Sequence, residues 1–384
     1  MNLFSIFFKK HIGFVVFIFL SNFFVFFINF TKFILQNRDY TTGSLIHPWV
    51  SVQYYFTYYN EFSKRALVGS AFNFFSIGIS EQSIFIFSIL SINIFFIFFY
   101  IYAKKAFDNY SKFYFNVFIL IILVSPAFAM QRGFMISFLD NANLAILIMT
   151  ITFLTYSSSK INYILIPLLI IIGTLTHEAF LLTSVPLIFA ISLHEIYNKN
   201  KSIILLIVEF FTVLTLVIII YLHGQVDQST LDAVGSTLPY NARGPAHDAF
   251  LIWTRNLSDN LPIVFSEYKW ATFRTILPIL LLVILYSYFF IRILKYSTLN
   301  IFAKFVFLSP FSLLLIFIIA HDFARFLALL IISICISFLY LLKFYKPTIV
   351  YTKVDKILVI LLILFSFAGP TGIMTGFPYF FHLW

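Results

Sequence analysis

The sequence predicts an all-α protein that crosses a membrane many times, and three observations support this fold class. Hydrophobic residues make up 61% of the 384 residues, and charged residues only 10%. A soluble domain carries about a quarter charged residues, so lipid is the expected solvent for this surface. Apolar runs of about 20 residues, the length of a membrane-spanning helix, recur along the whole chain. Runs of this length exclude a transmembrane β-barrel, whose segments are short and alternating.

About 11 spans are expected. The first follows Lys9 and Lys10, and it is too long and too aromatic for a cleaved signal peptide, which predicts a retained signal anchor. The stretch 161–194 is either two short helices or one broken pair meeting at Thr176-His177-Glu178. The apolar segment Leu67–Ile79 is short and favours a re-entrant or interfacial helix. The spans are placed at roughly 12–31, 83–103, 113–130, 142–158, 161–176, 179–194, 202–222, 273–294, 302–320, 323–342 and 357–376.

Basic residues predict the orientation of the chain. With the N-terminus in the cytoplasm, 15 of the 25 Lys and Arg residues fall on the inner side, mostly in very short loops. The net charge of +10 therefore indicates topology control and contact with anionic lipid, not a nucleic-acid partner. Seven of the eight arginines and 11 of the 15 acidic residues fall outside. This sorting indicates a use for the planar guanidinium, which binds phosphate bidentately.

The chain is expected to form a single transmembrane domain over residues 1–384, with two long outer connections. The first outer loop covers 32–82 and contains the re-entrant or interfacial segment. The second, a large periplasmic loop over 223–271, follows the seventh span. Long loops in a compact protein are usually functional or disordered, and the tryptophans of the second loop predict that it is folded.

Two arginines on the outer side, Arg65 and Arg132, each have both a functional and a structural interpretation. Arg65, in the charged cluster before the Leu67–Ile79 segment, could meet a lipid-linked phosphate or serve as a snorkelling anchor. Arg132 and Asp140 flank the outer end of one span and the start of the next, and they could simply pair to close a turn.

Two further constellations place ionisable residues between apolar stretches. His177 and Glu178 form one, and His321, Asp322 and Arg325 form the other. Ionisable residues at membrane depth are costly and usually functional, and His and carboxylates are common acid–base groups. Asp322 and Arg325 lie three apart on a helix and can pair. The alternative is that both constellations are polar caps of helix ends.

The large loop adds Arg243, His247, Trp253 and Arg255, which could grip sugars and phosphate. On the inner side, His194-Glu195 is expected to be solvated. Glu209, inside a span, either marks an ion pathway or satisfies a neighbouring helix.

No metal site or other cofactor is predicted. There is no His-Glu-x-x-His motif, EF-hand loop, P-loop or dinucleotide fingerprint. Cys335 is the only cysteine, so neither an intramolecular disulfide nor a cysteine-based metal site can form.

An arginine-rich outer site with His and carboxylates suits glycosyl transfer from a polyprenyl diphosphate. Arginines would neutralise the leaving diphosphate, and a carboxylate or His would accept the proton of the attacking hydroxyl. The hypothesis assigns diphosphate binding to Arg65, Arg132, Arg243 and Arg325, and the base to Glu178 or Asp322, tuned by His177 or His321. Asp140, His247, Trp253 and Arg255 would contact the glycan.

The chain resembles the Wzy-type O-antigen and capsular polysaccharide polymerases in size, Phe/Ile-rich spans, short inner loops and a large outer loop. Lys64-Arg65-Ala66-Leu67-Val68-Gly69, His177-Glu178 and His321-Asp322-x-x-Arg325 are similar to polar patches of that family. The resemblance implies an inverting, metal-independent, GT-C-like glycosyltransferase of the bacterial inner membrane. It would move a growing glycan from undecaprenyl diphosphate to the non-reducing end of the next lipid-linked repeat unit at the periplasmic face. A chain-length regulator protein is an implied partner.

Three alternatives stay open. A glycosyltransferase using polyprenyl-phosphate sugars could place its catalytic acid at Arg38-Asp39. An O-antigen ligase shares the outer-face chemistry but uses another acceptor. A flippase or transporter should instead carry charge at mid-membrane, where only Glu209 is clearly expected.

Overall fold

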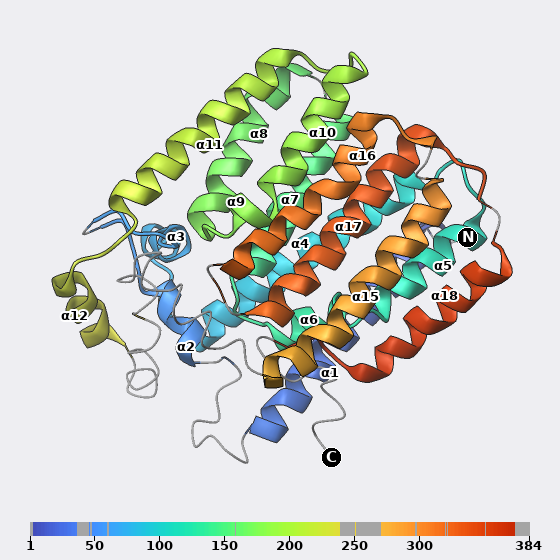
Figure 1. Cartoon of the computed structure of the whole chain (residues 1–384). Helices are drawn as coiled ribbons and strands as arrows, with labels where there is room; N and C mark the ends of the chain where they lie inside the picture. Colours follow the sequence, from blue (N-terminus) through green and yellow to red (C-terminus); the bar gives the residue numbers. More distant parts are fainter. Residues whose placement is uncertain are drawn as a thin grey trace.

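The fold is that of an all-α membrane protein. The computed structural model describes residues 3–36, 46, 48–59, 61–157, 159–238, 250, 270–295, 298–318, 320, 322–349 and 351–372, and all regular secondary structure in these ranges is helical (Figure 1). Five helices are long and apolar enough to cross a membrane: α1 (Leu3–Gln36), α4 (Glu81–Ala106), α11 (Ile203–His223), α15 (Trp270–Leu294) and α17 (Phe323–Tyr345). Each coincides with an expected span.

The other expected spans coincide with shorter apolar helices, so the number 11 stays a prediction. They are α5 (Lys112–Leu123), α7 (Asp140–Tyr156), α8 (Ser159–Thr176), α10 (Val185–Tyr197), α16 (Ile301–Leu308) continued by η3 (Ser309–Ile318), and α18 (Lys353–Leu364) continued by η4 (Phe365–Ala368). The expected span 113–130 ends early because Pro126 follows α5 and cannot continue a helix. The expected span 357–376 extends beyond the described residues.

The predicted break in 161–194 is confirmed. α8 ends at Thr176, the turn His177-Glu178-Ala179 follows, and α9 (Phe180–Thr183) leads into α10. Pro186 occupies the first turn of α10, where a missing N–H costs nothing. Two helices thus meet at a pair of ionisable residues.

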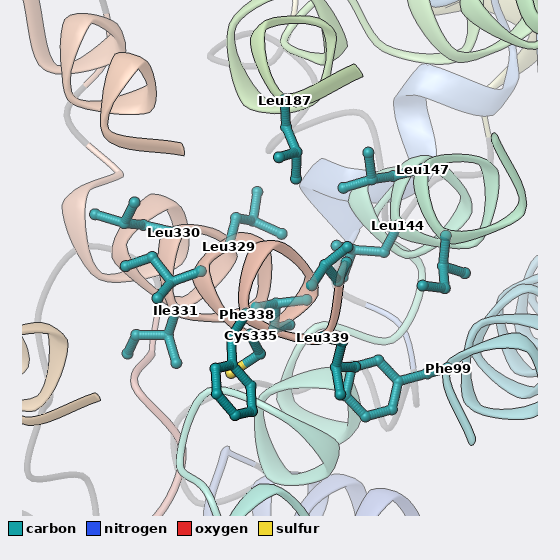
Figure 2. Packing of buried hydrophobic residues seen from close by; sticks show 14 of the residues in the cluster. Phe99, Leu144, Leu147, Leu187, Leu329, Leu330, Ile331, Cys335, Phe338 and Leu339 are labelled. Atoms are coloured by element: carbon teal, nitrogen blue, oxygen red, sulfur yellow. The ribbon is translucent and has the colours of Figure 1, made fainter. Parts of the chain in front are cut away.

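Helix α17 forms the centre of the bundle. Every residue from Phe323 to Leu342 is buried, as expected for a helix that is apolar all round. It packs against α4, α15 and α16, and Figure 2 shows its side chains directed to several neighbours. The labelled side chains come from α17 and from α4, α7 and α10: Leu329, Leu330, Ile331, Cys335, Phe338, Leu339, Phe99, Leu144, Leu147 and Leu187.

The charged residues of α17 define two ends of the bundle. Arg325 lies in its first turn and Lys343 in its last, and a rise of 1.5 Å per residue separates them by about 27 Å. That distance is close to the ~30 Å hydrocarbon core of a bilayer. Several described residues expected outside gather at the Arg325 end, and several expected inside gather at the Lys343 end.

Short helices cover the Arg325 end. They are α2 (Pro48–Ser51), η1 (Val52–Tyr54), α3 (Leu67–Phe74), α6 (Ala129–Phe134) and α12 (Gln228–Thr237). The segment expected to be re-entrant or interfacial is α3, which at eight residues is too short to span. Val52 and Phe56 of the first outer loop form one apolar cluster with Leu231 and Val234 of α12. The two long outer connections therefore pack on each other.

Gly133 allows α6 to lie directly against the backbone of α1. A Cβ there would fall 2.3 Å from the carbonyl oxygen of Val25. We expect Gly133→Ala to destabilise the protein by about 1–3 kcal/mol, because two backbones would have to separate. The melting temperature of the purified protein measures this. Gly78→Ala is the control, since nothing lies within 4 Å of its Cβ. Equal melting temperatures for both variants would contradict the packing.

Candidate functional site

Seven of the residues singled out from the sequence lie together at the Arg325 end of the bundle. They come from five separate parts of the chain: the loop before α3, α6, the start of α7, the α8–α9 turn, and the start of α17. The residues are Arg65, Arg132, Asp140, His177, Glu178, Asp322 and Arg325. We call this group the arginine–carboxylate cluster.

The strongest interaction in the cluster joins Arg65 to Glu178. The guanidinium Nε donates to Oε2 at 2.7 Å, and Nη2 donates to Oε1 at 2.6 Å, which is the bidentate geometry of an Arg–carboxylate pair. Arg65 has a left-handed backbone with φ of 65°, a conformation that costs a non-glycine residue about 1 kcal/mol or more. The pair ties the first outer loop to the α8–α9 turn.

Arg325 links two carboxylates. Its Nη1 lies 3.0 Å from Oδ2 of Asp322, which confirms the predicted pairing of residues three apart. Its Nε lies 3.5 Å from Oδ2 of Asp140, close enough for an ion pair but too far for a good hydrogen bond. The guanidinium also lies over the ring of Phe326, 4.5 Å from its centroid. Asp140 is therefore paired with Arg325, and the expected closure of the turn by Arg132 and Asp140 is not seen.

Arg132 is fully buried and only partly satisfied. Its Nη1 donates to Oδ1 of Asn141 at 3.1 Å, and Asn141 in turn donates to the carbonyl oxygen of Met135. Within the described part of the chain, Nε and Nη2 of Arg132 and Oδ2 of Asp140 have no hydrogen-bond partner. A buried donor without a partner costs roughly 1–3 kcal/mol, and more when charged. Two donor nitrogens of the guanidinium are thus available for an anion.

His177 is a buried, neutral member of the cluster. Its Nδ1 accepts the backbone N–H of Ala179 at 3.1 Å, so the ring proton of the neutral form is on Nε2. Burial, with the nearby Arg65, lowers the pKa of His177 to about 4. The 3.6 Å approach of Nδ1 to Glu178 is therefore not an ion pair at neutral pH, although the distance alone would permit one.

Glu178 is held as a carboxylate. Burial alone would raise its pKa, but the Arg65 guanidinium outweighs burial, and the pKa of Glu178 lies well below its ordinary value. A carboxylate with a lowered pKa is a weak general base. Glu178 is therefore better suited to holding Arg65 in place than to accepting a proton.

Two buried polar residues close to Arg132 in the chain, Ser137 and Gln131, make contacts that the sequence did not indicate. Ser137 has a φ of 80°, its N–H donates to Ser88, and its carbonyl oxygen accepts from the Tyr54 hydroxyl at 2.6 Å. Gln131 exchanges two hydrogen bonds with the backbone of Gly372, at 2.6 and 3.0 Å. No sequence signal could have shown these contacts, because each joins positions far apart in the chain.

Other expected site residues do not lie in the described part of the chain. These are His321, Arg243, His247, Trp253 and Arg255, together with Arg38 and Asp39 of the alternative glycosyltransferase interpretation. Their assignments stay predictions. Glu209 of α11 is buried and accepts the Ser192 hydroxyl at 2.7 Å, as expected for a carboxyl that satisfies a neighbouring helix.

The expectation that His194 and Glu195 are solvated is wrong. Both are buried, His194 completely. The Tyr340 hydroxyl of α17 lies 2.8 Å from Nδ1 of His194 and donates to Oε1 of Glu195 at 3.1 Å. The α10 end is covered because α17 continues past it, which the local sequence of α10 does not reveal.

No family model matches the chain, and no characterised protein or solved structure is significantly similar to it. Among the described residues there is no group of three or more His, Cys, Asp or Glu side chains that could hold a metal ion. The chemistry of the arginine–carboxylate cluster itself therefore defines the class of site.

The Arg65–Glu178 pair should be energetically coupled. We expect Arg65→Ala and Glu178→Ala each to cost about 3 kcal/mol, because each leaves a largely shielded charge without its bidentate partner. The double variant should cost at least about 1 kcal/mol less than the sum. Unfolding of the purified variants measures the cycle. Arg292→Ala is the control, since the Arg292 side chain is more exposed than that of Arg65 and its removal should cost less. Simple additivity would rule out the pairing.

His177 predicts a pH dependence of stability. Its folded-state pKa of about 4 lies below the ordinary 6.5, so the unfolded chain binds a proton that the folded chain does not. Stability should therefore fall as pH drops from 6.5 towards 4, by up to about 1.4 kcal/mol per pH unit, and not change above that range. Melting temperatures at pH 4.5, 5.5 and 7.5 measure this for the wild type and for His177→Gln. If the variant keeps the wild-type slope, another group is responsible.

Proposed function

We propose that this protein is a membrane glycosyltransferase that acts on a polyprenyl-diphosphate-linked glycan, and specifically an O-antigen polymerase. It would transfer the growing glycan from undecaprenyl diphosphate to the non-reducing end of a lipid-linked repeat unit. The single observation that carries the proposal is the convergence of two buried arginines, Arg132 and Arg325, and the partly buried Arg65 with three carboxylates at one end of the helical bundle.

The arginines suit a diphosphate because two of them have unused capacity. Arg132 Nε and Nη2 and Arg325 Nε have no hydrogen-bond partner within the described residues. Asp140 is paired with Arg325, and the Arg132 guanidinium also interacts electrostatically with it, so the two guanidiniums face one carboxylate. A diphosphate offers several anionic oxygens, and planar guanidinium forks bind such oxygens bidentately. Charge that develops on the leaving diphosphate would then meet preorganised donors.

Asp322 is the proposed general base. Its side chain is partly exposed, and Oδ2 contacts Arg325, so a hydroxyl accepting the glycan could reach it beside the leaving group. Glu178 positions Arg65, and neutral His177 can donate through Nε2. Arg243 is proposed to add a further diphosphate contact, His321 to act beside Asp322, and Asp140, His247, Trp253 and Arg255 to contact the glycan.

The proposal extends to location and architecture. The chain would cross the bacterial inner membrane about 11 times in a GT-C-like arrangement, with the N-terminus in the cytoplasm and the arginine–carboxylate cluster on the periplasmic side. The sorting of arginine to one end and of the short lysine-rich loops to the other supports this orientation. No metal or other cofactor is needed, and a chain-length regulator is a proposed partner.

A flippase or transporter is less well supported. Such a protein should carry charge at mid-membrane, whereas the described ionisable side chains gather mainly at the two ends of the bundle. Glu209 is the buried exception, and it is engaged by Ser192. An O-antigen ligase and a polyprenyl-phosphate-sugar transferase would use similar outer-face chemistry, so experiment must separate them.

Deleting the gene separates these functions. Loss of the polymerase should collapse the lipopolysaccharide ladder on a gel to core plus a single repeat, because ligation and export survive. Core without any repeat would indicate a ligase, a flippase or an earlier step. An unchanged ladder would contradict any role in O-antigen synthesis.

Complementation of the deletion strain with variants tests the site. Arg132→Lys and Arg325→Lys should each lower polymer synthesis about a hundredfold, because a lysine keeps the charge but loses the fork. Arg292→Lys, at the opposite end of the bundle, should restore the full ladder. All variants must be present in the membrane at equal amounts. Full ladders from both site variants would refute the assignment of these arginines.

A further inference from the structure

The end of the bundle opposite the arginines contains a second charged cluster. Three lysines from different elements converge on the last turn of α7. Lys343 of α17 donates to the carbonyl oxygen of Thr155 at 3.2 Å, and Lys201, just before α11, donates to that of Ser157 at 3.0 Å. Lys105 of α4 and Lys343 both lie over the ring of Tyr156, with Nζ 4.4 and 4.3 Å from its centroid. We call this group the lysine cluster.

Capping of α7 explains only part of this arrangement. Cations stabilise the C-terminal end of a helix, and the two carbonyl contacts serve that purpose. An ammonium has three N–H donors, however, and within the described residues Lys201 and Lys343 each use one in a hydrogen bond. Among the described residues, the Lys105 ammonium makes no hydrogen bond to a helix carbonyl and contacts only the Tyr156 ring. The Tyr156 hydroxyl is buried and has no hydrogen-bond partner in the described part of the chain.

The cluster has more positive than negative charge. The ammonium groups of Lys105 and Lys343 both contact the Tyr156 ring, so they lie within about 9 Å of each other. This distance is comparable to the ~8 Å Debye length, so salt does not fully screen their charges from each other. Glu195 and Asp108 are the carboxylates nearby. Glu195 makes both of its hydrogen bonds to uncharged partners, Tyr340 and Asn200. Three lysines against two carboxylates leave one excess positive charge.

The lysine cluster borders the lipid-facing surface. Lys105 is exposed and lies one turn after Ile101, which is itself exposed on α4. Lys201 lies just before the exposed Ile203 and Ile204 at the start of α11. A molecule with its anionic group on the lysines could therefore place acyl chains along α4 or α11.

We propose that Lys105, Lys201 and Lys343, with the Tyr156 hydroxyl, form a binding site for a phosphate ester at the inner membrane surface. The headgroup phosphate of an anionic phospholipid is the source that the position favours, and a soluble phosphate ester is the other. A phosphodiester carries one negative charge, which matches the excess, and its oxygens would accept the unused N–H and O–H donors. This inference is independent of the proposed function, because no residue of the arginine–carboxylate cluster takes part.

Binding to the purified full-length protein in detergent tests the proposal. Native mass spectrometry would compare phosphatidylglycerol, zwitterionic phosphatidylcholine and glycerol 3-phosphate. Wild type should bind phosphatidylglycerol saturably and in preference to phosphatidylcholine. The triple variant Lys105→Gln, Lys201→Gln, Lys343→Gln should bind it about a hundredfold more weakly, at about fivefold for each lysine removed. The matched control removes three exposed inner lysines outside the cluster, Lys104, Lys199 and Lys346, and should bind as wild type does.

The outcomes distinguish a lipid headgroup site, a site for a soluble phosphate ester and the absence of a specific site. Saturable binding of phosphatidylglycerol alone supports a lipid headgroup site, and comparable binding of glycerol 3-phosphate supports a phosphate-ester site with a soluble source. Binding of neither, or equal weakening in both triple variants, overturns the proposal, because general electrostatic attraction would then suffice. Since Lys201 and Lys343 also cap α7, Lys105→Gln alone provides the test if the triple variant fails to fold. In the described part of the chain, the Lys105 ammonium makes no hydrogen bond to the backbone. The single variant should bind about fivefold more weakly than wild type, and unchanged binding would then overturn the site.

Discussion

The burial of α17 on every side is the constraint on which the rest of the structure depends. A helix that is apolar around its whole circumference must be surrounded by other helices, and α4, α15 and α16 pack directly on it. Its own position then determines where its few charged residues lie. Arg325 at its start brings Asp140 and Asp322 together, and Lys343 at its end reaches the last turn of α7.

The two ends of the bundle use different cations for different geometric reasons. At one end, the guanidinium groups of Arg65 and Arg325 bind carboxylates from distant segments, and the paired side chains have little solvent exposure. At the other, lysine ammonium groups lie over an aromatic ring and cap helix carbonyls. A fork can satisfy two acceptors in one plane, whereas an ammonium is a point charge on a flexible stem. The first arrangement is preorganised and the second adaptable.

The predictions that the structure confirms depend on local patterns. The five long apolar helices followed from length and hydropathy, the break after Thr176 from two ionisable residues between apolar stretches, and the Asp322–Arg325 pair from their spacing. Of the two interpretations of Arg132 and Asp140, the local pairing is not seen, because Arg325 of α17 approaches Asp140 while Arg132 contacts Asn141. The solvation of His194 was wrong for the same kind of reason, since α17 covers it.

The sequence by itself determined that this chain is helical and apolar enough for lipid, because composition and run length are local properties. Only the tertiary structure decided which charges meet. Arg65 and Glu178 are 113 positions apart, and their pairing requires the first outer loop to fold back onto the α8–α9 turn. Such contacts depend on how helices pack around α17, and packing depends on shape complementarity among segments that no single stretch of sequence specifies.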